Sequence, residues 1–113
     1  MELNSGNNAV AFIPEVDMKL SANLTFTDVY SDKIEPTNAT NPQAAINNAF
    51  FVVNSVHDVA YHYGFTEEAF NFQIDNFGKG GQGDDPVQIT VHSSEGLNNA
   101  YMSTLPESVY SSL

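Results

Sequence analysis

The chain has 113 residues, enough for one small domain with a single hydrophobic core. Three lysines, no arginine and fourteen acidic residues give a net charge of −11, which disfavours binding to nucleic acid or to an anionic membrane surface. The absence of cysteine excludes disulfides, thiolate chemistry and cysteine-based zinc sites. No apolar run reaches the roughly 20 residues of a membrane span, and the first residues do not resemble a signal peptide.

Residues 1–40 have weak periodicity. Residues 9–13 predict a short strand, and residues 24–30 alternate loosely enough for a second one. Residues 31–40, which include Pro36, predict a linker.

Two glycosylation acceptor patterns of the form Asn-x-Thr begin at Asn23 and Asn38. They matter only on an exported protein, and such triplets also arise by chance in a chain rich in Asn and Thr. Both interpretations stay open at this point.

Residues 41–64 predict one long, mostly buried helix around which the other elements are arranged. Asn41 is expected to cap its free N–H groups, and Pro42 suits the first turn because its missing donor would be unpaired there. Gly64 can take the left-handed conformation that ends helices, and Phe65 can then fold back onto the last turn.

Most apolar side chains of this helix fall on one arc of roughly 200°, which is wider than a surface helix needs. We therefore expect the rest of the chain to cover more than one side of it. Phe51 lies outside this arc, and we expect a further element to cover it. The polar arc carries Asn47, Asn48, Asn54, Ser55, Asp58 and His62.

Beyond the helix, residues 66–69 predict a short second helix with two acids in its first turn. Residues 70–76 fit either a strand of period two or an extension of that helix. Residues 76–86 predict a loop, because they contain four glycines and a proline. Residues 87–92 alternate clearly and predict a strand whose apolar side packs on the long helix, and residues 100–102 predict a short edge strand.

The predicted organisation is a weakly structured segment at 1–40, a core at 41–107 and a frayed end at 108–113.

Residues 78–83 satisfy the dinucleotide-binding pattern G-x-G-x-x-G. That pattern works when a helix follows and binds pyrophosphate at its N-terminus. Here Asp84, Asp85 and a strand follow, and Lys79 is not followed by the Ser or Thr of a P-loop. We therefore favour a structural turn with close backbone contacts over nucleotide binding.

The histidines of the long helix do not have metal-ligand spacing. His57 and His62 are five residues apart, about 140° round the helix, whereas ligands on one face are three or four apart. We expect His57 to be a core histidine satisfied by hydrogen bonds, and Asp58 and His62 to face polar surroundings. A Ser/His/Asp triad is disfavoured, because it can be assembled on paper from any chain with this much serine.

Asp75, Asp84 and Asp85 flank the glycine loop and could bind calcium. They lack the regular ligand spacing of a calcium loop. We favour solvated loop acids.

Four blocks together resemble the fungalysin family of secreted fungal zinc metalloendopeptidases. Residues 50–73 resemble the family's first long helix, residues 76–84 its glycine loop, and residues 96–100 the turn that follows; residues 6–9 match more weakly. The likeness covers roughly residues 6–106.

The resemblance implies an α+β fold, the N-terminal part of a thermolysin-like metallopeptidase, in which one long buried helix packs against a small sheet with an edge strand. In such enzymes a later helical part carries His-Glu-x-x-His and a downstream glutamate that hold zinc. This sequence contains no such motif. We therefore expect zinc in the full-length family enzyme and none bound by this chain alone.

The resemblance also assigns one pair of residues to substrate. Asn99 and Ala100 match the pair on the edge strand above the cleft, where extended substrate pairs through main-chain hydrogen bonds. The alternative for Asn99 is that its side chain holds the preceding turn. No catalytic or metal-binding residue is assigned.

The resulting hypothesis is a fragment of an extracellular zinc metalloendopeptidase that supplies the substrate-edge side of the cleft for protein or peptide substrates. It is expected to be inactive alone and to self-associate through exposed apolar surface. The alternative is a free-standing, non-catalytic module that binds a peptide or partner.

Overall fold

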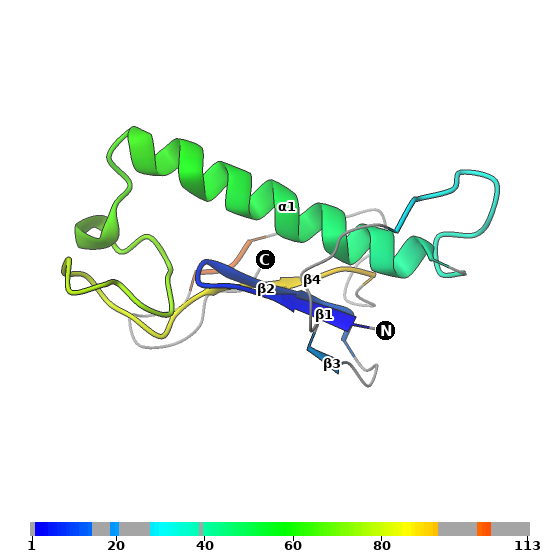
Figure 1. Cartoon of the computed structure of the whole chain (residues 1–113), viewed down its shortest axis with the longest axis horizontal. Coiled ribbons are helices and arrows are strands. Elements are labelled where there is room, and N and C mark those ends of the chain that lie inside the picture. Colours follow the sequence, from blue (N-terminus) through cyan, green and yellow to red (C-terminus); the bar gives the residue numbers. More distant parts are fainter. Residues whose placement is uncertain (1, 15–18, 21–27, 39, 93–101, 105–113) are drawn as a thin grey trace.

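The computed structural model describes residues 2–14, 19–20, 28–38, 40–92 and 102–104. One long helix lies along a small sheet, which confirms an α+β architecture (Figure 1). The elements in chain order are β1 (Glu2–Ser5), β2 (Ala9–Phe12), β3 (Lys19–Leu20), α1 (Asn41–His62), the 3-10 helix η1 (Glu67–Ala69) and β4 (Val87–Thr90).

The sheet has the strand order β3-β1-β2-β4. β1 and β2 form an antiparallel hairpin, whose turn is closed by a bond from the Gly6 N–H to the Ala9 carbonyl at 3.0 Å. β4 runs parallel to β2, with Ala9 opposite Val87 and Phe12 opposite Thr90, and β3 runs parallel to β1. Of the three N-terminal strands the sequence predicted only β2, because β1 and β3 have no apolar alternation of their own.

The hydrophobic core lies between α1 and the strands β2 and β4. Ala9 and Ala11 on β2 are fully buried, and their small side chains let the helix approach the sheet closely. Ile89 of β4 joins the same cluster as Ile46 of α1, which confirms the predicted packing of this strand toward the helix. The buried cluster consists of Ala9, Ala11, Ile13, Ile46, Val87 and Ile89.

Asn41 has a different role from the predicted cap. Thr40 is the N-cap residue and makes no side-chain capping bond, so the first N–H groups of α1 are not capped by a side chain. Asn41 is 0% exposed and turns toward the preceding loop. Its Oδ1 accepts the Ser31 N–H at 2.8 Å, and its Nδ2 donates to the carbonyls of Ser31 at 2.9 Å and Glu35 at 3.2 Å. The side chain therefore joins the loop to the helix.

The C-terminal end of α1 matches the prediction. Gly64 has a φ of 102°, which a residue with a Cβ rarely adopts, and its N–H donates to the Tyr61 carbonyl at 3.1 Å. The Phe65 N–H donates to the Ala60 carbonyl at 3.0 Å. These bonds satisfy carbonyls that the last turn would leave unpaired.

Burial of α1 is less complete than predicted, because the sheet covers only one side of it. Phe51 is 68% exposed, so the expected cover over this ring is wrong for this chain. Asn47, assigned to the polar arc, is instead buried, where it accepts a bond from Asn4 at 2.9 Å and donates to Asp28 at 3.2 Å.

Residues 70–76 form neither the strand nor the helix that the sequence allowed. Asn7, in the β1–β2 turn, accepts the Asp75 N–H at 2.8 Å and donates to the Asp75 carbonyl at 3.0 Å, while its own carbonyl accepts the Ile74 N–H. Phe70 and Phe72 take left-handed φ angles of 60°. The tertiary bonds to Asn7 therefore replace regular backbone pairing.

Several predicted features lie wholly or partly outside the described residues, among them most of the 24–30 strand and positions 100 and 101 of the edge strand. Residues 28–30 are not in a strand, and residues 31–38 form turns, as expected of a linker. Within the described part of the chain, no helix has the length and apolar character needed to cross a membrane.

Candidate functional site

A polar cluster around Gln73 joins the C-terminal half of α1 to η1 and the loop after it. Gln73 Oε1 is 2.9 Å from His57 Nε2 and accepts a bond from Asn71 at 2.9 Å. Gln73 Nε2 lies within 3.4 Å of Glu67 Oε1, and Tyr61 donates its hydroxyl to Glu67 Oε2 at 2.9 Å. Side-chain hydrogen bonds thereby join His57 of α1 to Gln73 in the loop and Tyr61 of α1 to Glu67 in η1.

Glu67 is a buried carboxylate, 3% exposed, at the centre of this cluster. Burial raises the pKa of this carboxyl, but hydrogen bonds from its own backbone N–H, Tyr61 and Gln73, together with the charge of Lys79, outweigh that effect. The pKa therefore lies below the ordinary value of 4.5. Glu67 is therefore ionised at neutral pH.

The lowered pKa of Glu67 predicts a specific loss of stability in acid. A carboxyl whose pKa is lower in the folded state stabilises the fold above its unfolded pKa, and this contribution disappears as the pH falls from about 4.5 through the folded value. Glu67→Gln should lower the melting temperature at pH 7, and its difference from the parent chain should shrink below about pH 4.5. Thermal melting across pH tests this, with the exposed neighbour variant Glu68→Gln as control. A difference independent of pH would contradict it.

The glycine loop packs its backbone against η1. Gly81 has a φ of 72°, and an added Cβ would overlap the Glu67 carbonyl oxygen. Asn76 donates its side-chain amide to the Gly80 carbonyl at 2.8 Å. The loop continues into β4 rather than into a helix. These contacts confirm the predicted structural turn.

The acids next to this loop differ from one another. Asp75 and Asp84 are exposed, as expected for solvated loop acids, whereas Asp85 is 3% exposed, so that prediction is wrong for Asp85. The backbone N–H groups of Asp84 and Asp85 donate to the carbonyls of Ile74 and Gln73, at 2.9 and 3.3 Å, and this pairing draws Asp85 into the protein.

His57 is largely buried and has partners at both ring nitrogens, Asp58 Oδ1 at 3.1 Å and Gln73 at 2.9 Å. This confirms a core histidine satisfied by hydrogen bonds. Asp58 and His62 are exposed. A shallow pocket of about 430 Å³ borders this region. Among the described residues no group of three His, Asp or Glu side chains is placed to hold a metal ion.

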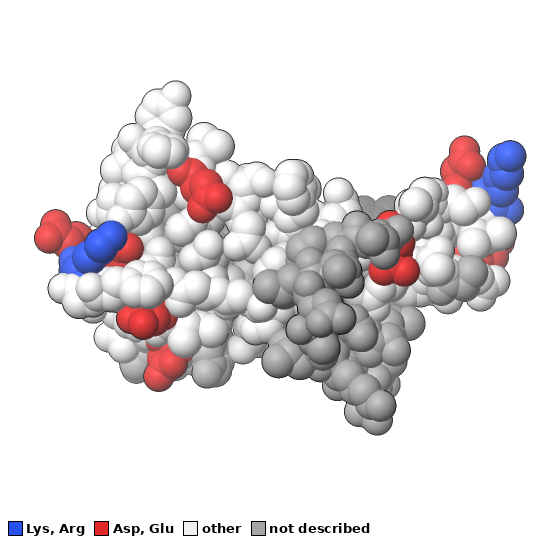
Figure 2. All heavy atoms as spheres, in the orientation of Figure 1, with Lys and Arg blue, Asp and Glu red and all other residues white. Residues whose placement is uncertain are grey.

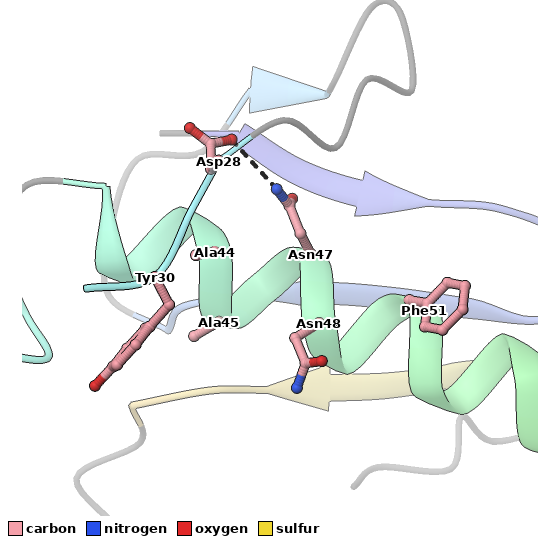
Figure 3. Close-up of a pocket in the computed structure, with 7 residues that line it drawn as sticks. All are labelled: Asp28, Tyr30, Ala44, Ala45, Asn47, Asn48 and Phe51. Carbon is pink, nitrogen blue, oxygen red and sulfur yellow. Dashed lines mark hydrogen bonds between the residues drawn. The ribbon is translucent and has the colours of Figure 1, made fainter. Parts of the chain in front are cut away.

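A second pocket, of about 540 Å³, lies beside the N-terminal half of α1. Asp28 and Tyr30 approach it from the preceding segment, and Asp28 bonds to Asn47 (Figure 3). Tyr30 and Phe51 stand toward opposite ends of the pocket (Figure 3). Its walls are mainly apolar in area, with Asp28 as the one charged side chain among the described residues that line it.

Four apolar side chains, three on α1 and a fourth at the residue just after its end, form a line that the sheet does not cover, here called the outer stripe. They are spaced by four, three and four residues and so lie on one helical face, and they are 47% to 89% exposed. Figure 2 shows few charged side chains along the visible face of the helix. The outer stripe consists of Val52, Val56, Val59 and Tyr63.

The predicted substrate residues Asn99 and Ala100 lie outside the described residues. The Gln73 cluster was not predictable from local sequence patterns, because Asn71 and Gln73 fit the polar half of an alternating strand. The polar side chains at 67, 71 and 73 all enter the interior, and no local sequence pattern indicates this burial.

The described residues form a helix-on-sheet unit with an apolar helix face left open to solvent. The family model for fungalysin metallopeptidase (M36) matches residues 1–111. The chain belongs to the fungalysin family of metallopeptidases.

The curated relatives carry names that agree with this family. Over 87 residues, or 77% of this chain, it is 46% identical to extracellular metalloproteinase 2 of Arthroderma gypseum. The proteins of the same name from Arthroderma otae and Trichophyton rubrum are each 42% identical over an equal length. In each case the matched region spans 13% of the relative's own length.

Proposed function

We propose that this chain is the N-terminal, substrate-edge part of the catalytic domain of an extracellular zinc metalloendopeptidase, which hydrolyses peptide bonds in proteins, and that it is inactive by itself. The observation that carries the proposal is the family match over residues 1–111 in a sequence without a His-Glu-x-x-His motif. The names of the relatives, extracellular metalloproteinases, support an extracellular location.

The outer stripe supports this proposal. An exposed apolar line at helical spacing is typical of a helix that packs on two sides, and the sheet covers only one. Burying one valine side chain completely contributes about 1.5–3 kcal/mol. We infer that the zinc-bearing part of the enzyme packs against this face. The same surface is expected to drive self-association of the isolated chain.

The family resemblance supports a substrate role for Asn99 and Ala100. In this proposal they lie on an edge strand and pair with extended substrate through main-chain hydrogen bonds. In this proposal the zinc and its ligands belong to another part of the enzyme, as the family resemblance implies.

The proposal predicts a gain of activity on reconstitution. The purified chain alone should bind no stoichiometric zinc and cleave no casein. The same chain joined to the zinc-bearing half of a family member should bind zinc and cleave casein. Metal analysis after dialysis and a casein assay measure this, with the motif glutamate of the added half replaced by Gln as control. One tightly held zinc per isolated chain would contradict the proposal. Peptide binding without any activity in the joined protein would favour a free-standing binding module.

The role of Asn99 is testable in the joined enzyme. If Asn99 bonds the substrate main chain mainly in the transition state, Asn99→Ala should remove about 1–3 kcal/mol of transition-state stabilisation. The value of kcat/KM should then fall on the order of ten- to a hundredfold, without a change in zinc content or melting temperature. If Asn99 only holds a turn, the melting temperature should fall while turnover per folded molecule stays intact. Unchanged activity and stability would remove Asn99 from the site.

A further inference from the structure

The segment before α1 presents an asparagine to solvent. This segment, cyan in Figure 1, extends beyond the N-terminal end of the helix. It closes in a turn in which the Asn38 N–H donates to the Glu35 carbonyl at 3.0 Å, with Pro36 at the second position, where proline is favoured. Asn38 is exposed, and its side chain takes part in none of the hydrogen bonds among the described residues.

Asn38 differs in this respect from its neighbours in the same region. Asn41 and Asn47 are buried, and their amides are committed to other groups of the protein. Asn41 also fixes the turn, because it holds the Glu35 carbonyl at 3.2 Å. The turn is thus anchored at its base while the Asn38 side chain is left to solvent.

We propose that Asn38 carries an N-linked glycan. Thr40 supplies the hydroxyl residue of the Asn-x-Thr acceptor pattern, and the residue between them is not proline. The donor is a lipid-linked oligosaccharide diphosphate. The Asn38 amide nitrogen forms a bond to the anomeric carbon of the first sugar, the bond from that carbon to the phosphate oxygen breaks, the lipid diphosphate leaves, and the amide proton is released.

The fold accommodates a glycan at this position without displacing a contact. Transfer takes place on the nascent chain, so the folded protein must leave room for a bulky polar group, and an exposed turn does so. After folding, the Thr40 hydroxyl donates to the Val29 carbonyl at 3.2 Å, which keeps the two ends of the loop together. The loop also exposes Val29, Tyr30 and Ile34, an apolar surface that a glycan would help to solubilise.

The glycan would not obstruct the proposed packing of α1 against the zinc-bearing part. The outer stripe begins at Val52, which is eleven residues beyond Asn41, or on the order of 16 Å along the helix axis. The inference rests on the proposed extracellular function, since only an exported chain meets the transferase.

The test uses the full chain with an added secretion signal in yeast. Asn23→Gln removes the other acceptor pattern and leaves Asn38 as the single one. The secreted variant should migrate as a larger species that peptide-N-glycosidase converts to the unmodified mass, leaving an aspartate at position 38 in the peptide spectrum. Adding Thr40→Val, which removes the hydroxyl at nearly constant volume, should abolish the shift, whereas Thr40→Ser should retain it.

The inference would be overturned if the Asn23→Gln chain entered the secretory pathway and carried no glycan. Glycan occupancy at Asn38 is read from mass alone, so it can be measured whether or not a variant folds. The measurement also requires no peptidase activity. An unmodified Asn38 in an active joined enzyme would contradict only the glycan, and a modified Asn38 in an inactive one would contradict only the proposed function.

Discussion

Gly81→Ala is expected to be the most damaging single substitution in the glycine loop. The new Cβ would overlap the Glu67 carbonyl oxygen and lie 2.8 Å from the Glu67 carbonyl carbon, so backbone would meet backbone and no side-chain rotation could relieve the overlap. The left-handed φ of 72° adds strain for any residue with a Cβ. We expect the free energy of unfolding to fall by at least about 3 kcal/mol, a large part of what a small domain has.

Gly78→Ala is the matched control for this prediction. Gly78 has nearly the same φ, 71°, but nothing lies within 4 Å of its added Cβ. It should therefore lose only the conformational term, about 1–2 kcal/mol. Urea denaturation followed by circular dichroism measures both variants, and limited proteolysis serves if Gly81→Ala does not fold. Equal losses in the two variants would refute the close approach of the loop to η1.

Asn41→Ala should be nearly as damaging, through a different mechanism. It removes three hydrogen bonds of 2.8 to 3.2 Å, two to the backbone of Ser31 and one to the Glu35 carbonyl, which keeps only its bond from the Asn38 N–H. Each of these hydrogen bonds contributes about 0.5–1.5 kcal/mol, so we expect the free energy of unfolding to fall by about 2–4 kcal/mol. Hydrogen exchange should speed up in residues 31–38 before it does so in β1 and β2.

Two further variants separate hydrogen bonding from helix propensity at this position. Asn48→Ala changes the same residue type at an exposed position of α1 and should alter stability by no more than about 0.5 kcal/mol. Asn41→Asp keeps the acceptor but directs a carboxylate oxygen at two carbonyl oxygens, and it should destabilise at least as much as Asn41→Ala. If Asn41→Ala and Asn48→Ala behaved alike, the loop-anchoring role of Asn41 would be wrong.

Local sequence patterns by themselves determined the elements whose period or turn chemistry is strong. The 3.6-residue period and Gly64 located α1 to within two residues of its end, and the alternation of residues 87–92 located β4. The glycine loop was identified as structural because no helix follows it. The combination of sequence blocks, rather than any single motif, indicated the family that the comparison then showed.

Tertiary structure alone decided which polar side chains are buried and which groups they bond to. Asn41 has the residue type and position of a cap, but its side chain bonds to the backbone of Ser31 and Glu35 in the preceding loop. Asn47 and Asp85 looked solvated, yet contacts with distant residues draw both into the interior.

The same reason explains residues 70–76 and the candidate site. Alternation at 70–74 predicted a strand or helix, but Asn7, more than sixty residues earlier in the sequence, bonds to the backbone at Asp75 and fixes an irregular path. Local patterns report which residues favour water or apolar surroundings along one element. They carry no record of a hydrogen-bond partner brought near by folding, and such partners position Gln73, Glu67 and His57 in one cluster.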